Sequence, residues 1–210
     1  MKYLILCGSN HNAINGIPRQ LVCVNGERVL DRTIRLLRSN GVDDIAITAT
    51  DSAFNSVGVE RINYKQEERT WINCFYPIDE PVCYIFGDVY FSEKAIETIV
   101  KTQTKDIEFF ASAPPFSKYY NKPWAEPFAF KAQNTDHFKE CVGIVKQYTK
   151  DRMWKRDPIA WEFWQVVKGT AINRIVYNNY TAINDYTCDI DCEADIDKIE
   201  KMVRLAHSTE

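Results

Sequence analysis

The sequence lacks both an excess of basic residues and any long hydrophobic run. Its 26 Lys and Arg residues against 29 Asp and Glu residues give a net charge of −3 at pH 7. A protein that grips duplex nucleic acid needs a basic excess to neutralise phosphates, and a polybasic membrane anchor needs one too. The longest apolar runs, such as 3–7 and 82–86, span five residues, whereas crossing a bilayer takes roughly 20. We therefore expect neither nucleic acid nor a membrane as a partner.

The cysteines lack the arrangement that a disulfide framework or a zinc site would need. There are seven, an odd number, and no two of them form a C-x-x-C pair. Several lie inside apolar runs, where a free cysteine acts as a small hydrophobic side chain. Cys188 and Cys192 flank two aspartates, but a structural zinc site needs four ligands and no second Cys or His pair stands at a suitable spacing. We expect reduced thiols in a cytoplasmic protein.

What the sequence does contain is an alternation of buried strands and amphipathic helices. An apolar run over 3–7 ends at Gly8, a helical pattern covers 28–40, and 45–49 is a second apolar run. Such a β-loop-α-β unit favours a parallel sheet with a right-handed crossover. We find no internal repeat and no low-complexity linker. The sequence therefore predicts one α/β domain over 1–210, Rossmann-like, with a mostly parallel central sheet flanked by helices.

The same alternation continues toward the C-terminus. The run 81–86 predicts another buried strand, and Ser92 can cap the helix that follows it. The segments 51–79 and 114–124 are less regular, and long irregular segments in a compact domain are often binding loops. Three more helices are expected, over 136–148, from Asp157-Pro158 as N-cap and first-turn proline, and over 193–205.

The loop after the first strand supplies the first candidate site. In open α/β sheets, ligands bind beyond the carboxyl ends of the strands. A loop that begins at Gly8 can offer backbone N–H groups to a phosphate, and Ser9 and Asn10 are small and polar. Arg19 could add charge-assisted hydrogen bonds to the same phosphate. The alternative is an ordinary surface loop.

Three aspartates supply a candidate metal site. Asp88 follows Gly87 directly after a buried strand, where it could hold Mg²⁺ together with phosphate oxygens and water. Asp189 and Asp191 stand two residues apart, on one face of an extended segment, and could share a cation. The alternatives are a turn or cap role for Asp88, a cap of the last helix for Asp191, and a solvated side chain for Asp189.

The order of the motifs is more informative than any one of them. Leu4-Ile-Leu-Cys-Gly8 is followed by Ile17-Pro-Arg-Gln-Leu21 and then by Val24-Asn-Gly-Glu-Arg-Val-Leu-Asp-Arg-Thr-Ile34. This series resembles the opening of the sugar-nucleotide pyrophosphorylases, which show L-A-A-G-x-G-x-R, then P-K or K-Q-L, then a V-N-G-K-P-I-L-E-R-T-I-like helix. The first loop departs from that pattern, because Cys7-Gly-Ser-Asn-His-Asn12 stands where the family has G-x-G-x-R.

Later segments extend the resemblance over nearly the whole chain. Phe86-Gly-Asp-Val-Tyr-Phe-Ser92 is similar to the family's G-D-x-x-F-S segment, whose Asp holds Mg²⁺. Asn121-Lys-Pro123 is similar to its E-K-P segment, where the Lys meets the sugar phosphate. Asp189-Ile-Asp191 looks like its D-I-D or E-I-D segment, which supplies the second metal carboxylate.

The resemblance implies a nucleotidyltransferase of the GT-A-like α/β fold, of the size of the cytidylyltransferases. Such an enzyme joins a nucleoside triphosphate (NTP) to a phosphorylated sugar or small alcohol, with Mg²⁺ as cofactor, and releases pyrophosphate. The NTP and the phosphorylated acceptor are its partners, and a homodimer is left open. The implied site residues are Arg19 and Lys122 in catalysis, Leu6, Cys7, Gly8, Ser9, Asn10 and Gly87 around the nucleotide, and Asp88, Asp189 and Asp191 around the metal.

Two other functions stay open at this stage. A glycosyltransferase of the same fold would use Asp189-Ile-Asp191 as its metal pair and would transfer a sugar without releasing pyrophosphate. A non-catalytic nucleotide-binding homologue would explain the altered first loop. The sequence identifies neither the base nor the acceptor.

Overall fold

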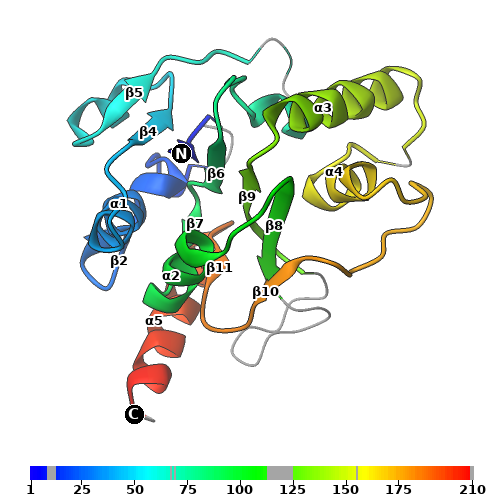
Figure 1. Ribbon diagram of the computed structural model, residues 1–210. Coiled ribbons are helices and arrows are strands. Elements are labelled where there is room, and N and C mark those ends of the chain that lie inside the picture. The colour runs from blue at the N-terminus through cyan, green and yellow to red at the C-terminus, as the bar shows by residue number, and fades with distance from the viewer. Residues whose placement is uncertain (9–12, 67, 69, 113–124, 155, 209–210) are drawn as a thin grey trace.

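A computed structural model describes residues 1–8, 13–66, 68, 70–112, 125–154 and 156–208. The chain folds around a central sheet with helices on both sides (Figure 1). The strands of this sheet are β1 (Lys2–Leu6), β4 (Ile45–Thr48), β5 (Glu60–Ile62), β6 (Val82–Phe86), β8 (Ile107–Ser112), β9 (Pro127–Ala132) and β10 (Thr181–Ile183). Their spatial order in this seven-stranded sheet is β10-β8-β9-β6-β1-β4-β5.

The sheet is mostly parallel, as the sequence predicts. β1 pairs in parallel with β4 and β6, β4 pairs in parallel with β5, and β10 pairs in parallel with β8. β9 is the exception, since it runs antiparallel to both β6 and β8. Every residue of β4 and β6 is buried, which explains why these strands read as continuous apolar runs rather than as alternating ones.

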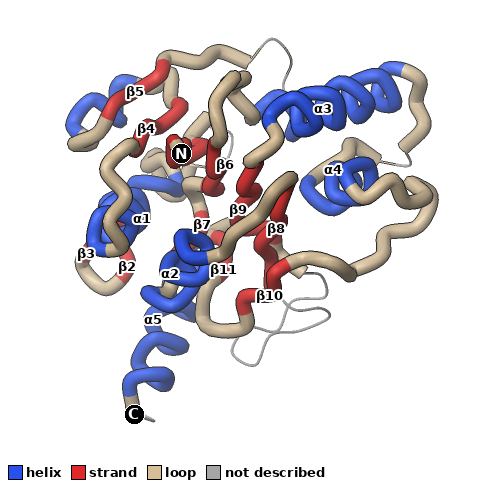
Figure 2. Tube along the Cα trace, in the orientation of Figure 1, coloured by secondary structure: helices blue, strands red, loops and turns tan. Residues whose placement is uncertain are grey.

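Helices cover both faces of the sheet. Figure 2 shows α1 and α2 together on one side, and α3 and α4 together on the other. The helices are α1 (Val29–Ser39), α2 (Glu93–Lys101), α3 (Thr135–Lys150), α4 (Ala160–Val167) and α5 (Glu193–His207), with short 3-10 turns η1 (Arg19–Leu21), η2 (Ser52–Ser56) and η3 (Trp71–Cys74). Two small antiparallel ribbons join β2 (Cys23–Val24) to β3 (Glu27–Arg28) and β7 (Val89–Tyr90) to β11 (Cys188–Asp189).

Helix α1 shows how the sequence sets an element and its ends. Leu30, Ile34 and Leu37 recur at helical spacing and are at most 5% exposed, so this face of the helix packs into the core. The chain leaves the helix at Gly41, whose φ of +80° lies in the left-handed region that favours glycine. The side chain of Ser92 caps α2 as expected, accepting a hydrogen bond from a backbone N–H of the first turn.

The start of α4 corrects one expectation. The sequence predicts Asp157-Pro158 as the N-cap and first turn, but α4 begins at Ala160 with Ile159 as its N-cap. The reason is that Glu162, in the first turn, reaches back and accepts a hydrogen bond from the Ile159 N–H at 3.1 Å. Glu162 thus satisfies the backbone N–H of the N-cap residue, as the glutamate of a capping box does.

Aromatic rings fill the core on the α3–α4 side. The ring of Phe75, just after η3, lies 5.1–5.8 Å from those of Phe130 in β9, Phe138 in α3 and Phe163 in α4. A second, smaller cluster forms where α5 packs near β2 and β7. Among the described residues, no helix combines the length and the apolar character that crossing a membrane requires.

Candidate functional site

A cavity of about 810 Å³ lies at the carboxyl ends of β1 and β6. Leu6 and Gly8 at the end of β1, and Phe86 and Asp88 at the end of β6, are part of its wall. This is the place where open α/β sheets bind ligands, because the loops that follow neighbouring parallel strands converge there. The volume is within the range of sites that enclose small molecules.

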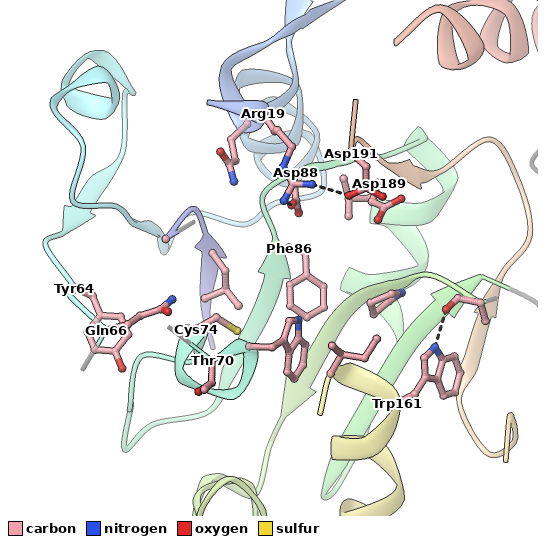
Figure 3. A pocket seen from close by; sticks show the side chains of 18 of the residues that line it. Arg19, Tyr64, Gln66, Thr70, Cys74, Phe86, Asp88, Trp161, Asp189 and Asp191 are labelled. Atoms are coloured by element: carbon pink, nitrogen blue, oxygen red, sulfur yellow. Dashed lines mark hydrogen bonds and ion pairs between the residues drawn. The ribbon is translucent and has the colours of Figure 1, made fainter. Parts of the chain in front are cut away.

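Arg19 stands at one edge of this cavity and contacts two aspartates at once. Its Nη2 lies 2.7 Å from Oδ2 of Asp88, and its Nη1 lies 2.7 Å from Oδ1 of Asp191. Nη1 also donates to the carbonyl oxygen of Ile190 at 3.0 Å. Figure 3 shows this guanidinium between the two carboxylates, with Asp189 beside them. The side chain of Arg19 is only 10% exposed, and those of its partners Asp88 and Asp191 are 23% and 51% exposed, so the Asp88 pair is the better shielded from water.

The cluster carries more negative than positive charge. Loss of hydration raises the pKa of Asp88 to about 6, the Arg19 guanidinium opposes that rise, and the negative charge of Asp189 adds to it. Arg19 also keeps a buried Nε that has no hydrogen-bond partner among the described residues. The cluster therefore holds one buried cation among three acids.

The short ribbon between β7 and β11 brings distant parts of the chain to this point. Asp189 pairs with Val89 in the ribbon, and the N–H of Ile190 donates to the backbone oxygen of Asp88 at 2.9 Å. The backbone N–H of Asp191 is in turn held by the carboxylate of Asp195 in the first turn of α5. The ribbon and the start of α5 thus fix the two acidic segments relative to each other.

Two glycines allow the chain to pass closely at this edge of the sheet. A Cβ atom on Gly87 would stand 2.7 Å from the carbonyl oxygen of Leu6 and 2.8 Å from Sγ of Cys7. A Cβ atom on Gly8 would stand 3.0 Å from Nε2 of Gln66, so this amide lies directly over the end of β1. Cys7 is 1% exposed and packs beneath Gly87, and burial raises the pKa of its thiol well above the usual value.

The cavity has two ends of different character. Figure 3 shows Tyr64 and Gln66 at one end and Trp161 at the other, with Phe86 between them and the Arg19 cluster above. Trp161 donates from Nε1 to the backbone oxygen of Ala125 at 2.7 Å, which fixes its ring in the wall. One end is thus an amide and a phenol, and the other is an indole.

A second arginine lines the indole end. Arg156 contacts Oε1 of Glu162 through Nε at 2.9 Å and through Nη2 at 2.8 Å, and 56% of its side chain stays exposed. The side chain of Glu162 is 7% exposed, so its carboxylate is a fixed anchor. The anchored guanidinium can offer its remaining nitrogen atom to an anion in the cavity.

The predicted site residues are largely brought together. Six of them line the cavity, whereas Cys7 and Gly87 form the packed layer behind it, and their roles toward a nucleotide or a metal stay predictions. Ser9, Asn10 and Lys122 lie outside the described residues. The six that line the cavity are Leu6, Gly8, Arg19, Asp88, Asp189 and Asp191.

Sequence reasoning missed much of the cavity wall. The irregular segment 51–79 was a signal for one end, because it contributes the side chains between η2 and η3. Nothing in the spacing marked Arg156 or Tyr177. The lining residues that were not singled out are Gln20, Thr50, Tyr64, Lys65, Gln66, Thr70, Cys74, Val89, Ala125, Pro127, Arg156, Ile159 and Tyr177.

The aspartates fit Mg²⁺ by their chemistry. In the described part of the chain, no three His, Cys, Asp or Glu side chains are grouped so that they alone could hold a metal ion. Mg²⁺ needs fewer, since it is commonly held by one or two carboxylates and shares its other positions with phosphates and water. Asp88 and Asp191 already bind one cationic group, the guanidinium of Arg19, which shows that their position favours a positive charge.

Solved structures of nucleotide transferases align with almost the whole of this chain. A Bacillus anthracis structure assigned as a glucose-1-phosphate thymidylyltransferase, in complex with a sucrose, aligns with a TM-score of 0.62 over 97% of this chain and 95% of that one, at 12% identity. The inositol-1-phosphate CTP transferase from T. maritima aligns with a TM-score of 0.61 over 96% of this chain and 95% of that one, at 13% identity. The chain has the fold of the sugar-phosphate nucleotidyltransferases.

The nucleotidyltransferase fold confirms the architecture that the motif order implied. No protein-family model matches the chain. No curated protein matches its sequence either. The likeness therefore lies in the arrangement of strands and helices, and the chemistry must be argued from the residues of this cavity.

Proposed function

We propose that this protein transfers a nucleoside monophosphate from an NTP to a phosphorylated sugar or another small phosphorylated alcohol, releasing pyrophosphate. The observation that carries the proposal is the position of Arg19, Asp88 and Asp191. They form one charged cluster at the carboxyl ends of β1 and β6, at the edge of a cavity of about 810 Å³. A cavity with two different ends beside one charged cluster suits two substrates that react at that cluster.

The end of the cavity next to β1 is the better place for the nucleotide. Gly8 opens the first loop there, and its missing side chain lets a polar group, here the Gln66 amide, approach the backbone closely. Gln66 lies over Gly8, and Tyr64 stands next to it in the wall. An amide can pair with the polar edge of a base and a phenol can stack on its face, so these two side chains would receive the base.

The opposite end suits the phosphorylated acceptor. Arg156 is held by Glu162 and is the cation on that side of the cavity, so its guanidinium would receive the acceptor phosphate. The ring of Tyr177, which packs on Trp161 and is 40% exposed, offers an apolar surface for the carbon skeleton. Lys122, outside the described residues, stays a predicted second partner of the acceptor phosphate.

The reaction needs no covalent intermediate on the protein. An oxygen of the acceptor phosphate forms a bond to the α-phosphorus in line with the bond that breaks, and pyrophosphate leaves with the electron pair of that bond. Arg19 would stabilise the charge that develops on the phosphate oxygens. Asp88 and Asp191, with Asp189 beside them, would hold Mg²⁺, which when bound supplies further charge neutralisation.

A matrix of substrates tests the proposal. The protein is incubated with Mg²⁺, each of the common NTPs and a panel of sugar-1-phosphates and other phosphorylated alcohols, and pyrophosphate is measured by a coupled assay. We expect release with at least one pair and none when the acceptor is omitted. Sugar transfer from a nucleotide-sugar without pyrophosphate would indicate a glycosyltransferase. Nucleotide binding by calorimetry with no turnover for any pair would indicate a non-catalytic binding protein.

A further inference from the structure

The guanidinium of Arg19 is committed to the carboxylates that a metal ion would need. Both of its terminal nitrogen atoms lie 2.7 Å from an aspartate oxygen, one on Asp88 and one on Asp191. A third contact, to the Ile190 carbonyl, fixes its orientation. The buried Nε has no hydrogen-bond partner in the described part of the chain, so the side chain is held from its far end.

A divalent cation and this guanidinium compete for the two carboxylates. Mg²⁺ binds carboxylate oxygens at about 2.0–2.1 Å and brings a shell of water with it. The guanidinium is in contact with one oxygen of each carboxylate, so it fills part of that space and repels a second cation. The side chains of Arg19 and Asp88 are 10% and 23% exposed, so solvent screens this repulsion only in part, although that of Asp191 is 51% exposed.

We propose that Arg19 acts as a resident cation that competes with divalent metal for Asp88 and Asp191, so that metal binds the pair only when the guanidinium has left it. The group that draws it away is an anionic phosphate chain in the same cavity, because a phosphate offers Arg19 the bidentate contact that it gives up. Phosphate frees the two carboxylates for the metal, and the metal frees Arg19 for the phosphate. Each of the two ligands therefore favours the binding of the other.

The first measurement uses the unmodified protein and no nucleotide. Mn²⁺ is titrated in as a stand-in for Mg²⁺, and the free ion is followed by its electron paramagnetic resonance signal. The proposal predicts that the protein binds Mn²⁺ only weakly at this pair. Tight stoichiometric Mn²⁺ binding that Asp88→Asn abolishes would overturn it, whether or not any variant of Arg19 folds.

The second measurement removes the competitor. Arg19→Met keeps a side chain of comparable length without the charge, and we expect it to bind Mn²⁺ about tenfold more tightly or better. Arg19→Lys has one ammonium group in place of two terminal nitrogen atoms. Its affinity for Mn²⁺ should lie between that of the unmodified protein and that of Arg19→Met. In the double variant Arg19→Met/Asp191→Asn the gained binding should be lost.

The matched control is Arg35→Met, which removes the same charge from an exposed ion pair with Glu27 outside the cavity. It should leave Mn²⁺ binding as weak as in the unmodified protein. Equal gains in Arg35→Met and Arg19→Met would overturn the proposal, as would no gain in a folded Arg19→Met protein. The inference rests on the proposed function, because it concerns the same cavity. Mn²⁺ binding requires no turnover, however, so the Mn²⁺ titration and the pyrophosphate assay can fail independently.

Discussion

Glu162 holds Arg156 with a single oxygen atom, Oε1, which lies 2.9 Å from Nε and 2.8 Å from Nη2. The other carboxylate oxygen, Oε2, accepts a hydrogen bond from the Ile159 N–H. One buried carboxylate thus starts helix α4 and aims a guanidinium at the cavity. The position of Arg156 is therefore tied to the position of the helix.

This relationship predicts a selective loss of acceptor binding. In Arg156→Gln we expect the KM for the phosphorylated acceptor to rise about tenfold or more, because a charged hydrogen bond to phosphate is lost. The KM for the NTP should change little, since Arg156 lies at the other end of the cavity. Steady-state kinetics with each substrate varied in turn measure both values.

Arg174→Gln is the control, because Arg174 is exposed and is not part of the cavity wall. It should leave both KM values unchanged. An equal rise of the two KM values in Arg156→Gln would contradict the assignment of this end of the cavity to the acceptor.

The close contact of β6 with β1 predicts a loss of stability in Gly87→Ala. The added methyl group would meet the Leu6 carbonyl at 2.7 Å, which cannot move without shifting a central strand, and the buried Cys7 sulfur at 2.8 Å. We expect the free energy of unfolding to fall by about 1–3 kcal/mol, the usual effect of overpacking a core. Urea denaturation followed by circular dichroism measures it.

Gly143→Ala is the matched control for this substitution. Gly143 lies within α3, and a Cβ atom there meets nothing within 4 Å. Alanine should stabilise that helix by about 0.5–1 kcal/mol, because glycine loses more conformational freedom in a helix. The same glycine-to-alanine change is thus expected to alter stability in opposite directions at the two positions. A Gly87→Ala variant as stable as the unmodified protein would contradict the tight packing of β6 against β1.

The buried and the exposed cysteines should differ strongly in their reactivity toward thiol reagents. Burial raises the pKa of Cys83 to about 12 and that of Cys141 to about 11. Because the thiolate is the reactive form, these thiols stay protonated and unreactive at mildly alkaline pH. Cys23 and Cys192 are exposed and should be the two that react readily with Ellman's reagent.

Denaturation supplies the reference for this labelling. In urea, all seven thiols of the sequence should react, and peptide mapping by mass spectrometry identifies which are modified first in the folded protein. Rapid modification of Cys83 or Cys141 in the native state would contradict the burial described here.

Parts of the fold could be predicted because their signals are local. The runs 3–7, 45–49 and 81–86 are apolar over their whole length, as central parallel strands are, and β1, β4 and β6 occupy them. β8 and β9 gave no comparable signal, because their pairing depends on each other and, for β9, on β6. The start of α4 was misplaced because a glutamate inside the helix supplies the cap.

The sequence placed some of the cavity's lining residues together but did not predict their contacts. The motif order placed Arg19, Asp88 and Asp191 in one cavity, although Arg19 and Asp191 are 172 residues apart in sequence. The sequence suggested that Arg19 would face a phosphate, whereas the structure shows it bound to the two acids. Such a contact depends on how the β7–β11 ribbon packs on η1, which no local pattern encodes.

Loss of the central cation should affect turnover strongly. In Arg19→Gln we expect kcat/KM to fall by about 100-fold or more, the usual effect of removing one fixed donor to a developing charge. Arg35→Gln, an exposed arginine on α1, should retain full activity and controls for the lost charge. Circular dichroism shows whether each variant is folded, and an active, folded Arg19→Gln would exclude Arg19 from the chemistry.

The most direct test of the proposed transferase activity follows the α-phosphorus itself. The protein is given Mg²⁺, an NTP labelled with ³²P at the α-phosphate, and a phosphorylated acceptor that supports pyrophosphate release. We expect the label in a new nucleotide-linked product and none in the pyrophosphate. Label that stays in unreacted NTP, or that appears only in free nucleoside monophosphate across all acceptors, would contradict the account.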